Sequence, residues 1–147
     1  MIKKVSLITG VAGTIGSNLA KNLIKKGHYI YGIDNFSSGK VINIKDILKN
    51  KKFSLIKCDL SNITNLVKCK KKFKKKIDYV WLLAANSDIK AGVINPNVDF
   101  KNTFFATRNS LIFFFNKFKI NTRIFFASSS AVYGNKKKKL SEKEKKN

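Results

Sequence analysis

Three glycines, Gly10, Gly13 and Gly16, lie in the stretch TGVAGTIG directly after a short apolar run. Between a strand and a helix, such a loop lets the backbone approach a pyrophosphate, whose charge is favoured by the free N–H groups of the helix N-terminus. A tight turn with close helix-to-strand packing is the structural alternative. Asp34 follows roughly 20 residues later, where a carboxylate can accept hydrogen bonds from both hydroxyls of an adenosine ribose. These residues predict a dinucleotide site, and because Asp34 would repel a 2′-phosphate, they favour NAD over NADP.

A second group of polar residues, ASSSAVYG, follows the last apolar run and contains Ser129, Ser130 and Tyr133. A serine that ends a central strand beside a nicotinamide can donate a hydrogen bond to a sugar oxygen as hydride moves. The alternative is that these hydroxyls satisfy neighbouring backbone groups at a strand end. The serines taken alone favour this alternative, whereas the glycines and Asp34 favour the functional interpretation.

The elements that must position these residues alternate between strands and helices. Short apolar runs predict strands at residues 3–9, 28–34, 53–59, 77–85 and 122–130. Between them, helices are predicted at about 15–26, 41–50, 60–76 and 98–119, the second of these being weakly amphipathic. This order predicts an α/β fold, a Rossmann-type doubly wound parallel sheet of about five strands with right-handed crossovers. Because ligands of such sheets bind at the carboxyl ends of the strands, the candidate residues fall where a site is expected.

Two of the predicted helices have distinctive faces. Ile63, Leu66, Val67 and Phe73 are expected to line one side of residues 60–76, with lysines on the solvated remainder. In residues 98–119 the phenylalanines spread over much of the circumference, so this helix must be covered on several sides. They are Phe104, Phe105, Phe113, Phe114, Phe115 and Phe118.

The 147 residues, 44% of them hydrophobic, have the size of one globular domain, which we assign to residues 1–134, followed by a basic polar tail at 135–147. A net charge of +23 would suit a polyanion such as nucleic acid. However, the basic residues are almost all lysine, which with abundant Asn, Ile and Phe indicates an AT-rich coding bias. Nucleic-acid readers favour arginine, and only Arg108 and Arg123 are present. A nucleic-acid partner is therefore the less favoured interpretation.

No stretch approaches the ~20 apolar residues of a membrane-spanning helix, and the N-terminal apolar run stops at Gly10, too early for a signal peptide. Cys58 and Cys69 lack CxxC spacing and have no cluster of His or acidic ligands nearby. We therefore expect no membrane partner, no metal site and a reducing, cytoplasmic location.

Five motifs in order resemble the NAD-dependent epimerase/dehydratase family of nucleotide-sugar enzymes, the extended branch of the short-chain dehydrogenases/reductases. They are the Gly-x-x-Gly-x-x-Gly loop, DNFSSGK, CDLSN, LAANSD and ASSSAVYG, one after each predicted strand. The resemblance covers essentially the whole chain and corresponds to the N-terminal part of these enzymes. It implies NAD as the cofactor and a nucleotide sugar as the substrate, whose hydroxyl is transiently oxidised.

The resemblance also implies roles for individual residues. Ser129 would be the catalytic hydroxyl that hydrogen-bonds the sugar, with Ser130 and Tyr133 on the substrate side. Thr103 and Ala106 stand where the family has asparagine and glycine, which affects local cofactor contacts. The implied cofactor-binding residues are Gly10, Gly13, Thr14, Ile15 and Gly16 in the loop, Asp34, Asn35, Ser38 and Gly39 near the adenosine, Asp59 and Leu60 near the adenine, and Ala84, Ala85 and Lys90 along the cofactor.

The family's proton relay is a Tyr-x-x-x-Lys on the helix after the fifth strand, where the lysine and the cofactor's positive charge lower the pKa of the tyrosine. Tyr133 and Lys137 have this spacing. However, Tyr133 lies only four residues after Ser129, and Gly134 with Asn135 indicates a turn. We therefore expect that the chain is truncated before the relay helix and catalyses nothing alone.

Two other hypotheses remain open at the level of sequence. One is a catalytically silent dinucleotide-binding or sensing protein, and the less favoured one is a basic nucleic-acid-binding module. In the family the long helix pairs with its copy in a second subunit, so the resemblance also implies a homodimer through the Phe-rich helix.

Overall fold

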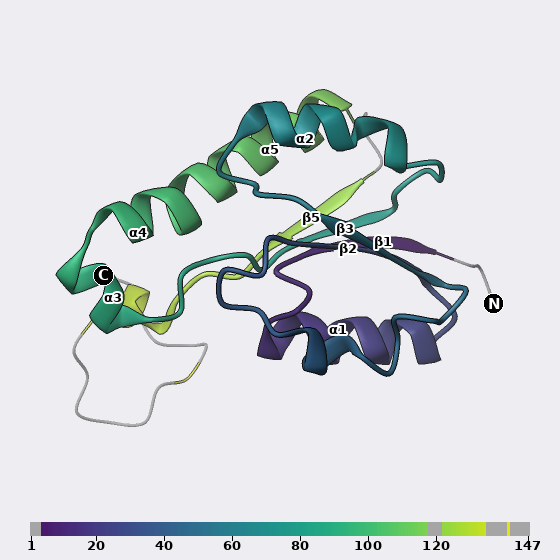
Figure 1. Cartoon of the computed structure of the whole chain (residues 1–147), viewed down its shortest axis with the longest axis horizontal. Helices are drawn as coiled ribbons and strands as arrows, with labels where there is room; N and C mark the ends of the chain where they lie inside the picture. The colour runs from purple at the N-terminus through teal and green to yellow at the C-terminus, as the bar shows by residue number, and fades with distance from the viewer. Residues whose placement is uncertain (1–3, 118–121, 135–140, 142–147) are drawn as a thin grey trace.

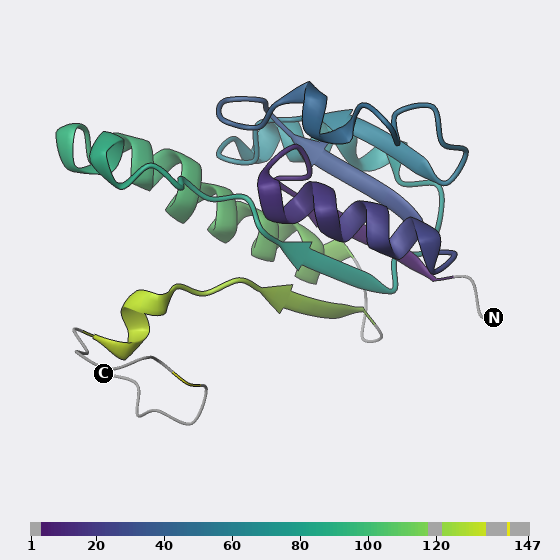
Figure 2. The same ribbon diagram turned by 90° about the horizontal axis from the view of Figure 1, so that it is seen from below.

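The computed structural model describes residues 4–117, 122–134 and 141. A five-stranded, wholly parallel sheet with the order β3-β2-β1-β4-β5 forms its centre. Figures 1 and 2 show β5 at one edge of the sheet. The strands are β1 (Val5–Thr9), β2 (Tyr29–Asp34), β3 (Phe53–Lys57), β4 (Tyr79–Leu82) and β5 (Arg123–Phe126). This architecture confirms the predicted Rossmann-type α/β fold.

Helices cover both faces of the sheet, α1 one face and α2 with α5 the other (Figure 1). The chain steps from β1 to β2 to β3 in one direction and then returns across β1 to β4 and β5. With right-handed crossovers, this reversal moves the connecting segments to the opposite face. The helices are α1 (Thr14–Lys25), α2 (Ile63–Cys69), α3 (Ile89–Ile94), α4 (Asn97–Asp99) and α5 (Ala106–Lys117).

Each face has its own apolar core. On the α1 side, Ala20 and Ile24 pack with Ile8 and Ile30 of the sheet. On the opposite side, residues of α2 and α5 pack on the other surface of the sheet. This second core includes Leu66, Phe113 and Phe114 of the helices and Leu7, Ile33 and Val80 of the strands. The alternation of neighbours such as Leu7 and Ile8 between the two cores is what a parallel sheet covered on both faces requires.

Two predicted helices differ from the observed elements. Residues 41–50 form a 3-10 turn (Val41–Ile44) and further turns rather than an amphipathic helix. One reason is that Asn43 Nδ2 donates to the Ala12 carbonyl oxygen at 2.7 Å, which ties this segment to the loop after β1. Helix α2 is also shorter than predicted, and its buried side is formed by Leu66 and Cys69.

The predicted apolar face of that helix is therefore partly wrong, because the Ile63 and Val67 side chains are exposed.

Among residues 4–117, 122–134 and 141, none of the helices combines the length and apolarity needed to span a bilayer. The proposed tail at residues 135–147 lies outside the described part of the chain, apart from Ser141.

The predicted long helix is present, but its start is not regular. A π-helical segment (Phe100–Phe105) joins α4 to α5, so that residues 97–117 run as one helical rod (Figure 2). Phe113 and Phe114 are buried, whereas Phe104, Phe105 and Phe115 are exposed. Phe118 lies outside the described residues. The rod is therefore covered on one side only by the described residues.

Candidate functional site

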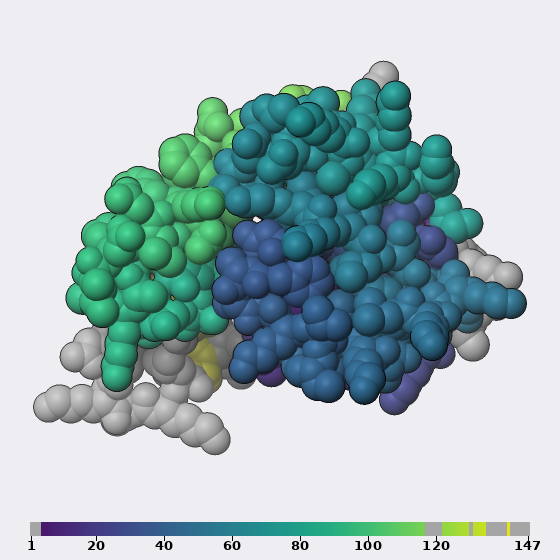
Figure 3. All heavy atoms as spheres, in the orientation of Figure 1, coloured from purple at the N-terminus to yellow at the C-terminus, as the bar shows by residue number. Residues whose placement is uncertain are grey.

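A cleft with a volume of about 220 Å³ opens at the carboxyl ends of β1 to β4. In Figure 3 the surface is hollowed where the green long helix meets the blue and teal segments around residues 40 and 60. Thirteen of the residues predicted for a cofactor line it: Gly10, Gly13, Thr14, Ile15, Gly16, Asp34, Asn35, Ser38, Gly39, Asp59, Leu60, Ala84 and Ala85. The other lining residues are Ser37, Cys58, Leu83, Ser87, Asn102 and Ala106.

The glycine loop fits against the end of β4 because it carries no side chains. Gly10 has φ 67°, in the left-handed region that favours glycine. A Cβ on Gly10 would lie 3.0 Å from the Cα and the backbone nitrogen of Ala84, and one on Gly16 would overlap the Gly10 carbonyl oxygen. The glycines therefore keep the turn between β1 and α1 tight, and backbone atoms form the floor of the cleft.

The N-terminus of α1 faces this floor without a side-chain cap. The N-cap residue is Gly13, and the first turn contains no acidic residue. The first N–H groups of a helix have no acceptor within the helix, and the helix dipole adds partial positive charge there. Because Thr14, Ile15 and Gly16 line the cleft, this end of α1 is suited to bind an anion.

Asp34 ends β2 and connects it to the glycine loop. Its side chain is 7% exposed. Oδ2 accepts a hydrogen bond from the Ala12 N–H and Oδ1 accepts one from the Phe36 N–H, both at 2.8 Å. A Cβ on Gly39 would lie 2.9 Å from Oδ1, so only glycine leaves space beside the carboxylate. Each oxygen retains a lone pair for a ligand hydroxyl.

Thr9, which sequence reasoning missed, sets the position of the fourth loop. Its hydroxyl donates to the Trp81 carbonyl oxygen at 3.3 Å and accepts hydrogen bonds from the Leu83 and Ala84 N–H groups at 3.0 and 3.1 Å. Because Thr9 is buried, this contact fixes the start of residues 83–85 against β1. The only signal in the sequence is a threonine directly before the first glycine.

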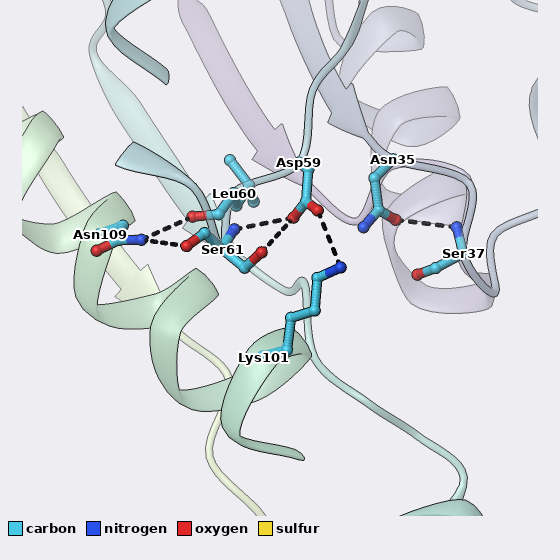
Figure 4. Close-up of polar contacts among 7 residues, drawn as sticks. All are labelled: Asn35, Ser37, Asp59, Leu60, Ser61, Lys101 and Asn109. Carbon is cyan, nitrogen blue, oxygen red and sulfur yellow. Dashed lines mark hydrogen bonds and ion pairs between the residues drawn. The ribbon is translucent and has the colours of Figure 1, made fainter. Parts of the chain in front are cut away.

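The wall formed after β3 carries a network of polar contacts (Figure 4). Asp59 Oδ1 accepts hydrogen bonds from the Ser61 N–H at 3.0 Å and the Ser61 hydroxyl at 2.7 Å. Asp59 Oδ2 lies 3.6 Å from Nζ of Lys101 on the long helix. Partial burial opposes ionisation, but the Ser61 hydrogen bonds and the Lys101 charge outweigh it, so the pKa of Asp59 is lowered. The carboxylate is therefore ionised at neutral pH.

Asn109 of α5 contacts the same wall, and sequence reasoning missed this residue as well. Its Nδ2 donates to the carbonyl oxygens of Leu60 at 3.2 Å and Ser61 at 2.8 Å, and the residue is buried (Figure 4). In the same wall, burial raises the pKa of Cys58 to about 12, with a hydrogen bond to Cys69 as a further cause. The thiol of Cys58 is therefore neutral, so Cys58 is part of the wall and is not a nucleophile.

Among the described side chains, three predicted residues do not line the cleft: Lys90, Ser129 and Tyr133. The side chain of Ser130 lies outside the described part of the structure. Lys90 is exposed on α3. Ser129 Oγ accepts a hydrogen bond from the Ala131 N–H at 3.2 Å and caps the 3-10 turn Ser130–Tyr133. This is the backbone contact that was the alternative interpretation of the serines. Gly134 follows with φ 68°, so Tyr133 ends a turn, while Lys137 lies outside the described residues.

Comparisons with known proteins give a consistent result. Residues 7–147 match the sequence model of the family described as GDP-mannose 4,6 dehydratase. Protein CapI of Staphylococcus aureus is 36% identical over 139 residues, which are 87% of this chain and 38% of CapI. The UDP-Glc/GlcNAc 4-epimerase of Campylobacter jejuni superposes with a TM-score of 0.81 at 28% identity, covering 98% of this chain and 43% of the epimerase.

A third structure is the UDP-glucose 4-epimerase of Thermus thermophilus in complex with NAD, with a TM-score of 0.78 over 97% of this chain and 44% of the enzyme. At 23% identity this likeness shows the fold alone. The chain thus spans about two fifths of the length of these proteins.

Proposed function

The chain belongs to the GDP-mannose 4,6-dehydratase family, and from this premise we propose that it binds NAD in the cleft at the carboxyl ends of β1 to β4. The observation that carries the proposal is the junction of Asp34 with the glycine loop. There a buried carboxylate, an uncapped helix N-terminus and a backbone floor face one cleft. One anionic group and two vicinal hydroxyls, as in an adenosine ribose with its pyrophosphate, match these three features.

The cofactor lies across the walls in a defined order under this proposal. The α1 N-terminus binds the pyrophosphate, and Asp34 accepts hydrogen bonds from the ribose hydroxyls beside Gly39. Asp59 and Leu60 contact the adenine from the wall after β3. Residues 84–87 continue toward the nicotinamide. The cleft volume of about 220 Å³ is below the roughly 300–1,000 Å³ of pockets that enclose a whole small ligand, so the described residues enclose only part of a dinucleotide.

We further propose a nucleotide sugar as the substrate. The support is the likeness to the C. jejuni protein, which is a UDP-Glc/GlcNAc 4-epimerase. Bound NAD supplies hydride acceptance from a sugar carbon and hydride return. Ser129 donates a hydrogen bond to the sugar oxygen through its hydroxyl hydrogen, which stays available because Oγ is the acceptor in the contact with the Ala131 N–H. Residues 1–147 alone bind cofactor without turnover, because Tyr133 lies in a 3-10 turn that ends at Gly134.

Calorimetry with NAD and NADP tests the binding proposal. NAD should bind measurably and more tightly than NADP; absence of NAD binding would refute it. UDP-glucose incubated with the protein and NAD should give no epimer by NMR. Turnover that disappears in Tyr133→Phe would show that Tyr133 acts as the relay base after all.

A further inference from the structure

The long helix contacts the adenine-side wall of the cleft at two points. Lys101 approaches Asp59 Oδ2 at 3.6 Å, and Asn109 donates to the carbonyl oxygens of Leu60 and Ser61 (Figure 4). Both side chains come from the same rod and extend toward the same loop. Between them, Asn102 and Ala106 line the cleft itself.

The π-helical segment explains how two residues eight positions apart reach one loop. In a regular α-helix, eight residues turn the chain by about 800°, which leaves the two side chains roughly 80° apart. A π turn accommodates one additional residue per turn. The side chains of Lys101 and Asn109 then point in directions like those of residues seven positions apart, within about 20° of each other around the helix axis. Since Lys101 lies within the π segment (Phe100–Phe105), this irregularity turns it toward Asp59.

We propose that Lys101 is a positioning residue that orients Asp59 for recognition of an adenine base, and that the π segment serves to place it. The inference rests on the proposed function. Asp59 Oδ1 is occupied by both Ser61 donors, so Oδ2 is the oxygen available to a ligand. Nζ of Lys101 lies 3.6 Å from this second oxygen, and its charge favours orientations of the carboxylate that keep Oδ2 near it. A carboxylate oxygen only accepts hydrogen bonds, so it favours the exocyclic amine of adenine over the carbonyl of hypoxanthine.

The test compares NAD with nicotinamide hypoxanthine dinucleotide, in which a carbonyl replaces the exocyclic amine of the base and the neighbouring N1 carries a proton. Lys101→Met keeps most of the side chain's length and removes its charge, while Lys101→Arg keeps the charge. Lys49→Met is the matched control, an exposed lysine that does not line the cleft. Each variant is titrated with both dinucleotides by calorimetry, and its folding is checked by thermal unfolding.

Because the Lys101 side chain is 61% exposed, its interaction is screened by solvent. Lys101→Met should lower the preference for NAD over the hypoxanthine analogue about two- to fivefold. Lys101→Arg should restore the preference, and Lys49→Met should leave it unchanged. A merely structural role would lower both affinities equally and leave their ratio intact.

Two results would overturn the inference alone while the proposed function stands. One is NAD binding by the parent protein without preference over the hypoxanthine analogue. The other is an unchanged preference in a folded Lys101→Met protein. If the parent protein does not bind NAD at all, the proposed function fails and this inference fails with it.

Discussion

Replacing Asp34 with asparagine tests the central contact of the cleft, with nearly no change in shape. In the folded protein both carboxylate oxygens accept a backbone N–H, from Ala12 and from Phe36, each at 2.8 Å. An asparagine side chain has one oxygen and one NH₂ group. One of the two backbone donors must then face another donor, so a hydrogen bond to a charged group is lost in a site that is 7% exposed.

The expected loss of stability follows from this one lost hydrogen bond. Hydrogen bonds to charged groups contribute about 1.5–3 kcal/mol each. Asp34→Asn should therefore lower the free energy of unfolding of the ligand-free protein by about this amount. Under the proposed function the ribose hydroxyls lose the same charged acceptor, so NAD affinity should fall about ten- to hundredfold. NADP affinity should fall less, because the repulsion of its 2′-phosphate is removed as well.

Urea unfolding measures the first effect, and calorimetry with NAD and NADP measures the second. Asp46→Asn is the control: Asp46 is an exposed carboxylate that contacts Lys21 at 3.1 Å outside the cleft, so NAD affinity should not change. Unchanged stability in Asp34→Asn would refute the argument from the two backbone hydrogen bonds. NADP binding more tightly than NAD in the parent protein would refute the role given to Asp34.

Three further predictions concern other parts of the molecule. Burial lowers the pKa of His28, although the charge of Asp78 opposes this. The unfolded chain therefore binds the proton more tightly, and the free energy of unfolding should decline as pH falls below about 6.5. Urea unfolding midpoints between pH 8 and 5 should show this decline, and His28→Gln should flatten it. Gly16→Ala should lower the free energy of unfolding by about 1–3 kcal/mol and weaken NAD binding, since its methyl group would overlap the Gly10 carbonyl; unchanged calorimetry and urea curves would contradict this. Exposed Phe100, Phe104, Phe105 and Phe115 should drive self-association that grows with salt as the +23 charge is screened, and a monodisperse monomer by light scattering at both low and high salt would contradict it.

The strands and most of the cleft could be predicted because their signals are local. A buried parallel strand is a short apolar run, and the glycines and Asp34 occur directly after such runs. Once the strand order is accepted, the loops after β1 to β4 must meet at one edge of the sheet. That is why residues as distant as Gly10, Asp34, Asp59 and Ala84 were predicted together and line one cleft.

The features that escaped prediction depend on partners far away in the sequence. Thr9 and Asn109 act through hydrogen bonds to residues 81–84 and 60–61, which no local pattern reveals. The π segment has no recognised sequence signal and depends on how the long rod packs. Residues 41–50 have helical spacing of apolar residues, yet the contact of Asn43 with the Ala12 carbonyl favours turns. Tertiary hydrogen bonds overrode local propensity at each of these places.

The position of β1 between β2 and β4 has a consequence for synthesis on the ribosome. Strands β1, β2 and β3 are complete once residue 57 has emerged, and they can pair as soon as they leave the exit tunnel. The second edge of β1 stays unpaired until Tyr79–Leu82 (β4) has been synthesised, because β4 pairs there with Ser6 opposite Tyr79. During that interval the nascent chain presents an open strand edge and an apolar surface, features that make folding intermediates prone to aggregation. A chaperone that binds apolar segments near the tunnel exit would find its target in this interval.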